Sequence, residues 1–161
     1  MKKLRIYLDT SVINFLFADD APEKRDATVD FFDRVARHSM PVCISQLVLD
    51  EIGQTPDRVR REKLLAVIRQ RRLPLLPAEP GDEVEALVKA YVGQGAIPAH
   101  SPNDALHVAI CTVNAVDVLA SWNFKHLANV SRERRIRAVN EALGYVYPLR
   151  IASPEEVSDD E

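Results

Sequence analysis

The sequence lacks the features that define several common protein classes. Its only two cysteines, Cys43 and Cys111, lie in separate apolar segments without the paired spacing of metal ligands, so we expect buried reduced thiols and no zinc site. No apolar run is long enough to span a bilayer, and the apolar N-terminal stretch is cut by Arg5 and Asp9, with no small-residue cleavage site after it. The sequence has no GxGxxG motif, which argues against dinucleotide binding. These absences predict a cytoplasmic protein without membrane contacts.

The length and the charge distribution predict one packed domain with an acidic end. A chain of 161 residues that is 47% apolar suits one core. We expect this domain over residues 1–152 and a flexible acidic tail over residues 153–161. Five acidic residues lie in the tail, so the rest of the chain carries 21 basic and 19 acidic side chains. Two basic clusters could collect phosphates, although charge alone fits solvated helix faces better: Arg58, Arg60, Arg61, Lys63, Arg69, Arg71 and Arg72; and Lys125, Arg132, Arg134, Arg135 and Arg137.

Short apolar segments alternate with segments of helical periodicity. We expect strands over residues 5–8, 41–45, 73–76, 116–120 and 146–151, and helices over residues 12–17, 23–38, 46–52, 58–72, 81–91, 102–114 and 132–143. The gaps between strands are long enough for helical crossovers, which favours parallel pairing. The sequence therefore predicts an α/β fold, a three-layer sandwich around a central, mainly parallel, Rossmann-like sheet of four to five strands.

Four polar residues stand where the ends of parallel strands would meet. Asp9 ends the first strand, and Asn123 follows the strand at 116–120. Glu51 lies on the helix after the second strand, and Asp104 begins the helix that leads into the fourth. Ligands of open α/β sheets bind at the carboxyl ends of the strands. If the strands are neighbours, these side chains form one site for a hard divalent cation, which prefers oxygen ligands.

Each of these residues also has a structural interpretation. Asp9 could cap the following helix, although Thr10 and Ser11 are available for that role. Asp104 could complete a capping box with Ser101, which we expect to cap the helix that begins with Pro102. Glu51 taken alone would be a surface helix residue, and Asn123 an ordinary loop residue.

Three further side chains near these positions carry weaker signals. We expect His107 to pack in the core, although it could touch the site. His126 is expected to be exposed near Lys125. Trp122 could stack on a nucleobase, although packing is the commoner role of a tryptophan.

Four segments together resemble the motifs of the PIN domain family. Residues 8–13 (LDTSVI) resemble the first acidic motif, and residues 49–52 (LDEI) resemble the second. Residues 103–109 (NDALHVA) are similar to the third motif, and residues 118–123 (VLASWN) to the last strand and turn, where many members have an aspartate. Order and spacing agree over nearly the whole chain.

The resemblance implies a PIN-like nuclease domain over residues 1–152 that hydrolyses single-stranded or structured RNA with Mg²⁺ or Mn²⁺. It implies Asp9, Glu51 and Asp104 as metal ligands, with Glu51 binding directly or through water, and Asn123 as a catalytic residue that positions water or substrate. Ser11, Ser121, Trp122 and Lys125 are the candidate substrate-binding residues. The resemblance also implies that the chain is a VapC-like toxin of a type II pair. Its implied partners are a cognate antitoxin and a second copy of the chain in a homodimer. Because Asn123 is neutral, we expect one metal ion in the resting state.

Two other functions stay open at this point. A PIN module that binds nucleic acid or serves as a scaffold without catalysis would also fit the neutral Asn123. A phosphatase of the haloacid-dehalogenase type also begins with a strand that ends in aspartate, but its chemistry needs a second aspartate where this chain has Ser11.

Overall fold

A four-stranded parallel sheet lies at the centre of the protein. The structure is a computed structural model and describes residues 3–77 and 81–157. The strands are β1 (Ile6–Leu8), β2 (Val42–Cys43), β3 (Val118–Ala120) and β4 (Arg150–Ala152), in the order β2-β1-β3-β4. All three pairings are parallel, so the strands end at one common edge. The predicted α/β class is confirmed.

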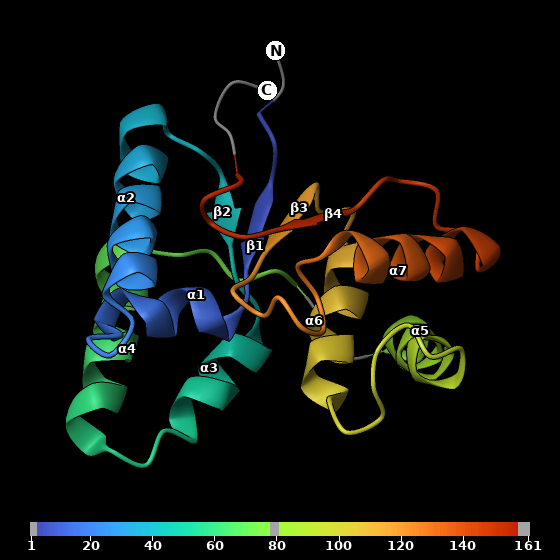
Figure 1. The fold of residues 1–161 in the computed structure, drawn as a ribbon, viewed down its shortest axis with the longest axis horizontal. Helices are drawn as coiled ribbons and strands as arrows, with labels where there is room; N and C mark the ends of the chain where they lie inside the picture. Colours follow the sequence, from blue (N-terminus) through green and yellow to red (C-terminus); the bar gives the residue numbers. More distant parts are fainter. Residues whose placement is uncertain (1–2, 78–80, 158–161) are drawn as a thin grey trace.

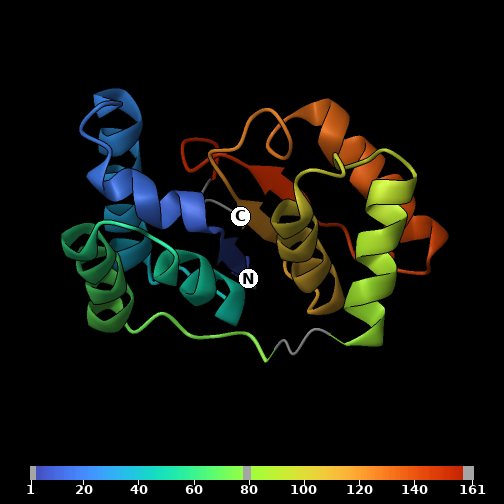
Figure 2. The same cartoon turned by 90° about the horizontal axis from the view of Figure 1, so that it is seen from below.

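Helices cover both faces of the sheet, which gives the predicted three layers (Figures 1 and 2). The first half of the chain supplies one side: α1 (Thr10–Asn14), the 3₁₀ helix η1 (Phe15–Phe17), α2 (Pro22–His38), α3 (Gln46–Gly53) and α4 (Arg58–Arg71). The second half supplies the other: α5 (Asp82–Gly93), α6 (Pro102–Val113) and α7 (Val130–Ala142). The parallel connections require such crossovers, and the helical segments between the strands provide them.

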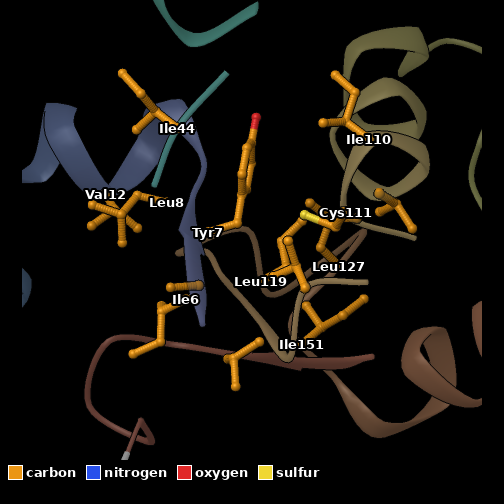
Figure 3. Close-up of a cluster of buried hydrophobic side chains, with 14 of the residues drawn as sticks. Ile6, Tyr7, Leu8, Val12, Ile44, Ile110, Cys111, Leu119, Leu127 and Ile151 are labelled. Carbon is orange, nitrogen blue, oxygen red and sulfur yellow. The ribbon is translucent and has the colours of Figure 1, made fainter. Parts of the chain in front are cut away.

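The core is continuous across the sheet. All three residues of β1 are fully buried, as expected for a central parallel strand that is covered on both faces. Figure 3 shows Ile6, Leu119 and Ile151 from neighbouring strands packed together beneath side chains from α1 and α6. Both cysteines are free and buried, as predicted, and burial raises the pKa of the Cys43 thiol to about 11.

The strands are shorter than predicted, and proline explains two of the differences. Residues 73–76 form only an isolated bridge between Ile44 and Leu75, because Pro74 and Pro77 beside it lack the N–H that a ladder needs. This correction leaves four strands. The last strand begins at Arg150 instead of residue 146, because Pro148 interrupts the segment.

The start of the predicted flexible tail belongs to the folded domain. Arg34 on α2 donates hydrogen bonds to the carbonyls of Pro154 (3.0 Å) and Val157 (2.7 Å). The Glu156 carboxylate accepts from the backbone and hydroxyl of Ser153, and Val157 is buried. The domain therefore extends to residue 157, and the rest of the predicted tail, 158–161, lies outside the described residues. Within residues 3–77 and 81–157, no helix is long and apolar enough to cross a membrane.

Candidate active site

The four predicted polar residues line one pocket at the carboxyl edge of the sheet. The cavity has a volume of about 320 Å³ and lies where β1 leads into α1 and where α3 and α6 approach it. Its lining consists of Asp9, Thr10, Ser11, Asn14, Glu51, Asp104, His107 and Asn123. Residues that are separated by up to 114 positions in the sequence thus meet, as the parallel topology predicts.

Asp9 is the buried acid of this pocket. It occupies the residue before α1 with an extended backbone, and its side chain makes no capping hydrogen bond of normal geometry; the Val12 N–H only contributes a weak lowering of its pKa. The Ser11 hydroxyl donates to Asp9 Oδ1 at 2.5 Å. Burial raises the pKa of Asp9, although the nearby His107 and the hydroxyls of Ser11 and Ser121 partly offset this rise. A cation in the pocket would relieve the cost of burying this charge.

Glu51 is held by three donors that its sequence position does not reveal. Its Oε1 atom accepts hydrogen bonds from Thr10 Oγ1 and His107 Nε2, both at 2.6 Å. Its Oε2 atom accepts from Asn103 Nδ2 at 3.2 Å. Burial raises the pKa of Glu51, but these hydrogen bonds outweigh burial and the net pKa is lowered. Glu51 therefore stays ionised, and it is not the plain surface residue of the alternative interpretation.

A chain of hydrogen bonds connects Glu51 to the centre of the sheet. His107 Nδ1 lies 2.7 Å from the Tyr7 hydroxyl on β1, and that hydroxyl lies 2.7 Å from Ser45 Oγ. Because an ionised Glu51 can only accept, Nε2 of His107 carries a proton. His107 is buried, as predicted, but it also contacts the site directly. Its place one turn after Asp104 on α6 is the sequence signal for this role.

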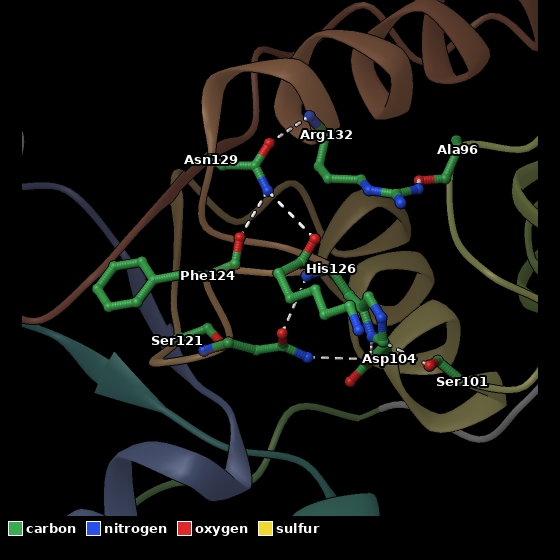
Figure 4. A network of polar contacts seen from close by, with 10 residues as sticks. Ala96, Ser101, Asp104, Ser121, Phe124, His126, Asn129 and Arg132 are labelled. Atoms are coloured by element: carbon green, nitrogen blue, oxygen red, sulfur yellow. Dashed lines mark hydrogen bonds and ion pairs between the residues drawn. The ribbon is translucent and has the colours of Figure 1, made fainter. Parts of the chain in front are cut away.

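Asp104 and Asn123 lie in a second network (Figure 4). Asn123 Nδ2 donates to Asp104 Oδ2 at 3.1 Å, and His126 Nδ1 lies 3.4 Å from the same oxygen. Asn123 Oδ1 accepts from the His126 backbone N–H at 3.0 Å, which folds the loop back toward α6. The His126 side chain is only 14% exposed, so the prediction of an exposed histidine is wrong.

The predicted capping box at the start of α6 is also absent. Ser101 occupies the position before the helix but makes no side-chain capping bond, and its hydroxyl lies 3.1 Å from His126 Nδ1 instead. Asp104 is likewise engaged by Asn123 and His126. Both side chains thus face the loop after β3, which leaves Asp104 in the pocket.

The predicted substrate-binding residues divide into buried and exposed ones. Ser11 Oγ accepts from the Trp122 backbone N–H at 3.0 Å, and the fully buried Ser121 accepts from the Asn123 backbone N–H at 3.0 Å. Trp122 is 4% exposed, and its indole N–H donates to Thr28 Oγ1 at 2.9 Å, so its ring is not available for base stacking. Of the four, Lys125 is exposed. The two serines and Trp122 therefore hold the loop against α1 and α2.

The donor chemistry of the pocket suits a hard cation, but the ligands are not gathered into a ready cage. Within the part of the chain that the structure describes, no three His, Cys, Asp or Glu side chains are close enough to hold a metal ion. Each carboxylate is bound instead by donors of the protein, as described above. The observed arrangement is a pocket with oxygen donors on several sides, in which the side chains would have to close around an ion.

Some arginines of the two predicted basic clusters stabilise the fold through hydrogen bonds to backbone carbonyls. Arg60 on α4 donates to the carbonyl of Asn14 at 3.1 Å, and Arg132 on α7 donates to that of Ala96 at 3.0 Å. Arg58, Lys63 and Arg69 line an open groove on α4. Because Asn14 also lines the acidic pocket, Arg60 itself lies close to that pocket.

A larger cavity of about 460 Å³ lies at the opposite edge of the sheet. Its acidic side chains, Asp117 and Glu156, already accept backbone hydrogen bonds from Arg5 and Ser153. Asp117 directly precedes β3, whereas the four candidate residues lie beyond the carboxyl ends of the strands. Size alone therefore does not identify the functional pocket.

Comparisons with known proteins identify the family of this chain. A family model for the PIN domain matches residues 6–137, and the chain belongs to the PIN domain family. PIN domains are generally nucleases, so this membership sets aside the phosphatase interpretation. Among solved structures, the chain is similar to a member of the VapBC family of toxin-antitoxin systems, VapBC-5, from Mycobacterium tuberculosis, at 15% identity and a TM-score of 0.48, covering 92% of this chain and 98% of that one. No curated protein matches the chain.

Proposed function

We propose that this PIN domain is a metal-dependent endoribonuclease that hydrolyses single-stranded RNA. The observation that carries the proposal is a buried carboxylate, Asp9, in the same small pocket as Glu51, Asp104 and Asn123. A pocket that concentrates negative charge where burial raises the pKa of one acid favours the entry of a cation. Mg²⁺ or Mn²⁺ fits this oxygen-rich donor set better than a soft metal does.

The side chains would divide the work of holding the ion. Asp9 and Asp104 would be the principal ligands. Glu51 would contribute mainly through Oε2, because Oε1 already accepts from Thr10 and His107. When bound, the ion supplies Lewis-acid polarisation of the phosphodiester and lowers the pKa of an attacking water.

Asn123 would orient the reactants, because a neutral amide cannot act as a base. Its carbonyl oxygen accepts from the His126 backbone and its amino group donates to Asp104, so the amide plane is fixed on both sides. The amino group could also donate to a phosphate oxygen. The exposed Lys125, two residues further on, is our candidate for a neighbouring phosphate.

A cleavage assay with matched variants tests the proposal. Purified protein with Mg²⁺ or Mn²⁺ should cut labelled single-stranded RNA, and EDTA should stop the reaction. Asp9→Asn and Asp104→Asn should lose cutting. Asp117→Asn should keep it, because this equally buried acid lies at the opposite edge of the sheet. Equal cutting by all variants would reveal a contaminating nuclease, and no cutting by the wild type would favour the non-catalytic, nucleic-acid-binding module.

We further propose that the enzyme acts in the cytoplasm as the toxin of a type II pair, inhibited by a cognate antitoxin, and that it forms a homodimer. The support is the resemblance of its four motifs to those of PIN domains, which implies a VapC-like toxin. Induced expression should arrest bacterial growth, the Asp9→Asn variant should not, and co-expression of the neighbouring gene should relieve the arrest. Growth that is unaffected by the active wild-type enzyme would contradict the toxin role. Light scattering of the purified protein would measure the oligomeric state.

A further inference from the structure

An aromatic cluster with a lysine at its centre borders the proposed active site. Phe15, Trp122 and Phe124 lie around Lys24 of α2, with Nζ 5.6, 5.8 and 5.3 Å from the respective ring centroids. The Trp122 ring also contacts the rings of Phe15 and Phe124 at centroid distances of 5.8 and 5.9 Å. We refer to these four residues as the aromatic cluster. It joins η1, α2 and the loop after β3.

No anionic side chain of the described residues pairs with the lysine of the aromatic cluster. Among the described residues, its ammonium group lies near the three rings but makes no hydrogen bond or ion pair. The ring faces attract the cation but carry no net charge. Lys24 thus retains a full positive charge that a phosphate could pair with.

Phe124 is the part of the aromatic cluster that solvent can reach. Its side chain is 43% exposed, whereas Trp122 is buried. Asn123, its chain neighbour, lines the acidic pocket, and Figure 4 shows the Phe124 ring pointing away from Asp104.

Two short connections link the aromatic cluster to the pocket. Phe15 follows α1, whose residues Thr10, Ser11 and Asn14 line the pocket. The Trp122 backbone N–H donates to Ser11 Oγ, and the same hydroxyl donates to Asp9. The cluster is therefore connected to the pocket through Ser11, Asn14 and Asn123, which are lining residues next to its members in the chain or bonded to them.

We propose that the aromatic cluster is a nucleobase subsite, in which a base next to the cleaved phosphodiester stacks on Phe124 and an adjacent phosphate pairs with Lys24. Aromatic side chains beside a positive charge are the common means of holding single-stranded nucleic acid without reading its sequence. This inference rests on the proposed function, since it takes RNA as the substrate of the adjoining pocket. It assigns to Phe124 the stacking role that the sequence suggested for Trp122.

Binding measurements without metal test the subsite separately from catalysis. The probes are fluorescein-labelled dodeca-adenylate RNA and an abasic ribose-phosphate strand with the same number of phosphates, both measured in EDTA by fluorescence anisotropy. Phe124→Ala should raise the Kd for the RNA about 5- to 100-fold and leave the Kd for the abasic strand unchanged. Phe124→Trp should retain affinity, whereas Phe124→Leu should lose it. Leu143→Ala, a truncation at a similarly exposed apolar residue just after the far helix α7, should change neither Kd.

Lys24 gives a second and independent measurement. Lys24→Ala should weaken binding of both strands, because both carry phosphates. It should also reduce the slope of log Kd against log salt by about 0.7, the value for one phosphate contact on a single strand. Melting curves identify any variant that loses its fold, and only folded variants are compared.

The alternative outcomes are distinct. Equal losses for RNA and abasic strand in Phe124→Ala, or full RNA affinity in Phe124→Leu, would overturn the subsite and indicate an apolar surface for a protein partner. Absence of RNA cleavage by the wild type, with base-dependent binding intact, would reject the nuclease and keep the subsite as a base-binding site. Cleavage with no dependence on Phe124 would reject the subsite and keep the nuclease.

Discussion

Replacing Asp9 by asparagine should separate the metal-binding role of this residue from a structural one. Asparagine keeps nearly the same shape and can still accept the hydrogen bond from Ser11, but it carries no charge. Without metal, we expect Asp9→Asn to be at least as stable as the wild type at neutral pH. The reason is that burial opposes ionisation of Asp9 and raises its pKa, so its charge costs free energy in the folded state.

The expected size of the metal effect follows from linkage. An ion that binds only the folded state stabilises it by about 2.7 kcal/mol at a concentration one hundred times its Kd. For a domain of this length, each kcal/mol shifts Tm by about 2–4 °C, so Mn²⁺ should raise the wild-type Tm by about 5–10 °C. Asp9→Asn should show much less of this increase, whereas Asp117→Asn should show all of it.

The pH dependence gives a check without metal. Because folding raises the pKa of Asp9, the folded protein binds a proton at a higher pH than the unfolded chain does. The cost of the buried charge is therefore present at neutral pH and is relieved as the pH falls from the raised value to the ordinary one. The difference in unfolding free energy between Asp9→Asn and the wild type should shrink over that interval, by about 1.4 kcal/mol for each unit of pKa rise.

Denaturant unfolding followed by circular dichroism, with EDTA or Mn²⁺ and across pH, measures all of these quantities. A clear loss of metal-free stability in Asp9→Asn at neutral pH would refute the reasoning, because it would mean that the carboxylate stabilises the fold as it stands. An equal Mn²⁺ effect in wild type and variant would show that the ion binds elsewhere.

Two other changes address the partners of the acids. Asn123→Asp should lower the metal-free Tm, because the new carboxylate would replace a hydrogen-bond donor that lies 3.1 Å from Asp104. Calorimetric titration should count one bound Mn²⁺ in the wild type and two in the variant. Two ions in the wild type would contradict the single-metal prediction. Tyr7→Phe should cost about 1–3 kcal/mol of unfolding free energy, because His107 Nδ1 and Ser45 lose a hydrogen-bond partner, and it should also weaken the stabilisation by Mn²⁺. The control Tyr91→Phe breaks a buried network with Thr112 and Asn140 and should lower stability without changing the Mn²⁺ effect. Equal Mn²⁺ effects in the two variants would exclude a positioning role for Tyr7.

The sequence predicted the convergence of the acids because that depends on topology. Asp9 directly follows β1 and Asn123 lies in the loop just after β3, and parallel strands bring such ends to one edge. The partners of the acids could not be predicted in the same way. Whether His126 faces solvent or Asp104 depends on how the loop after β3 folds back, and this turn is fixed by the Asn123 amide. Such a hydrogen bond cannot be predicted from the spacing of residues in the sequence.

The errors have similar physical causes. The sequence around Ser101 fits a capping box, but its two side chains contact His126 and Asn123 in the loop after β3 instead. The segment 73–76 has strand-like apolar residues, but flanking prolines limit its pairing to one bridge. Trp122 has the chemistry for stacking, and only the packing of α2 shows that Thr28 binds its indole and closes it off.

The pocket depends on the register in which β1 pairs with β2 and β3. Ile6 lies opposite Val42 on one side and Val118 on the other, and the Asp9 N–H continues the ladder by bonding to the Ala120 carbonyl. A slip by a single residue would turn Tyr7 to the other face of the sheet and withdraw the aspartate from its edge. Misaligned chains would thus be wholly inert, so impaired folding should lower the fraction of competent molecules while each correctly paired one keeps its full turnover.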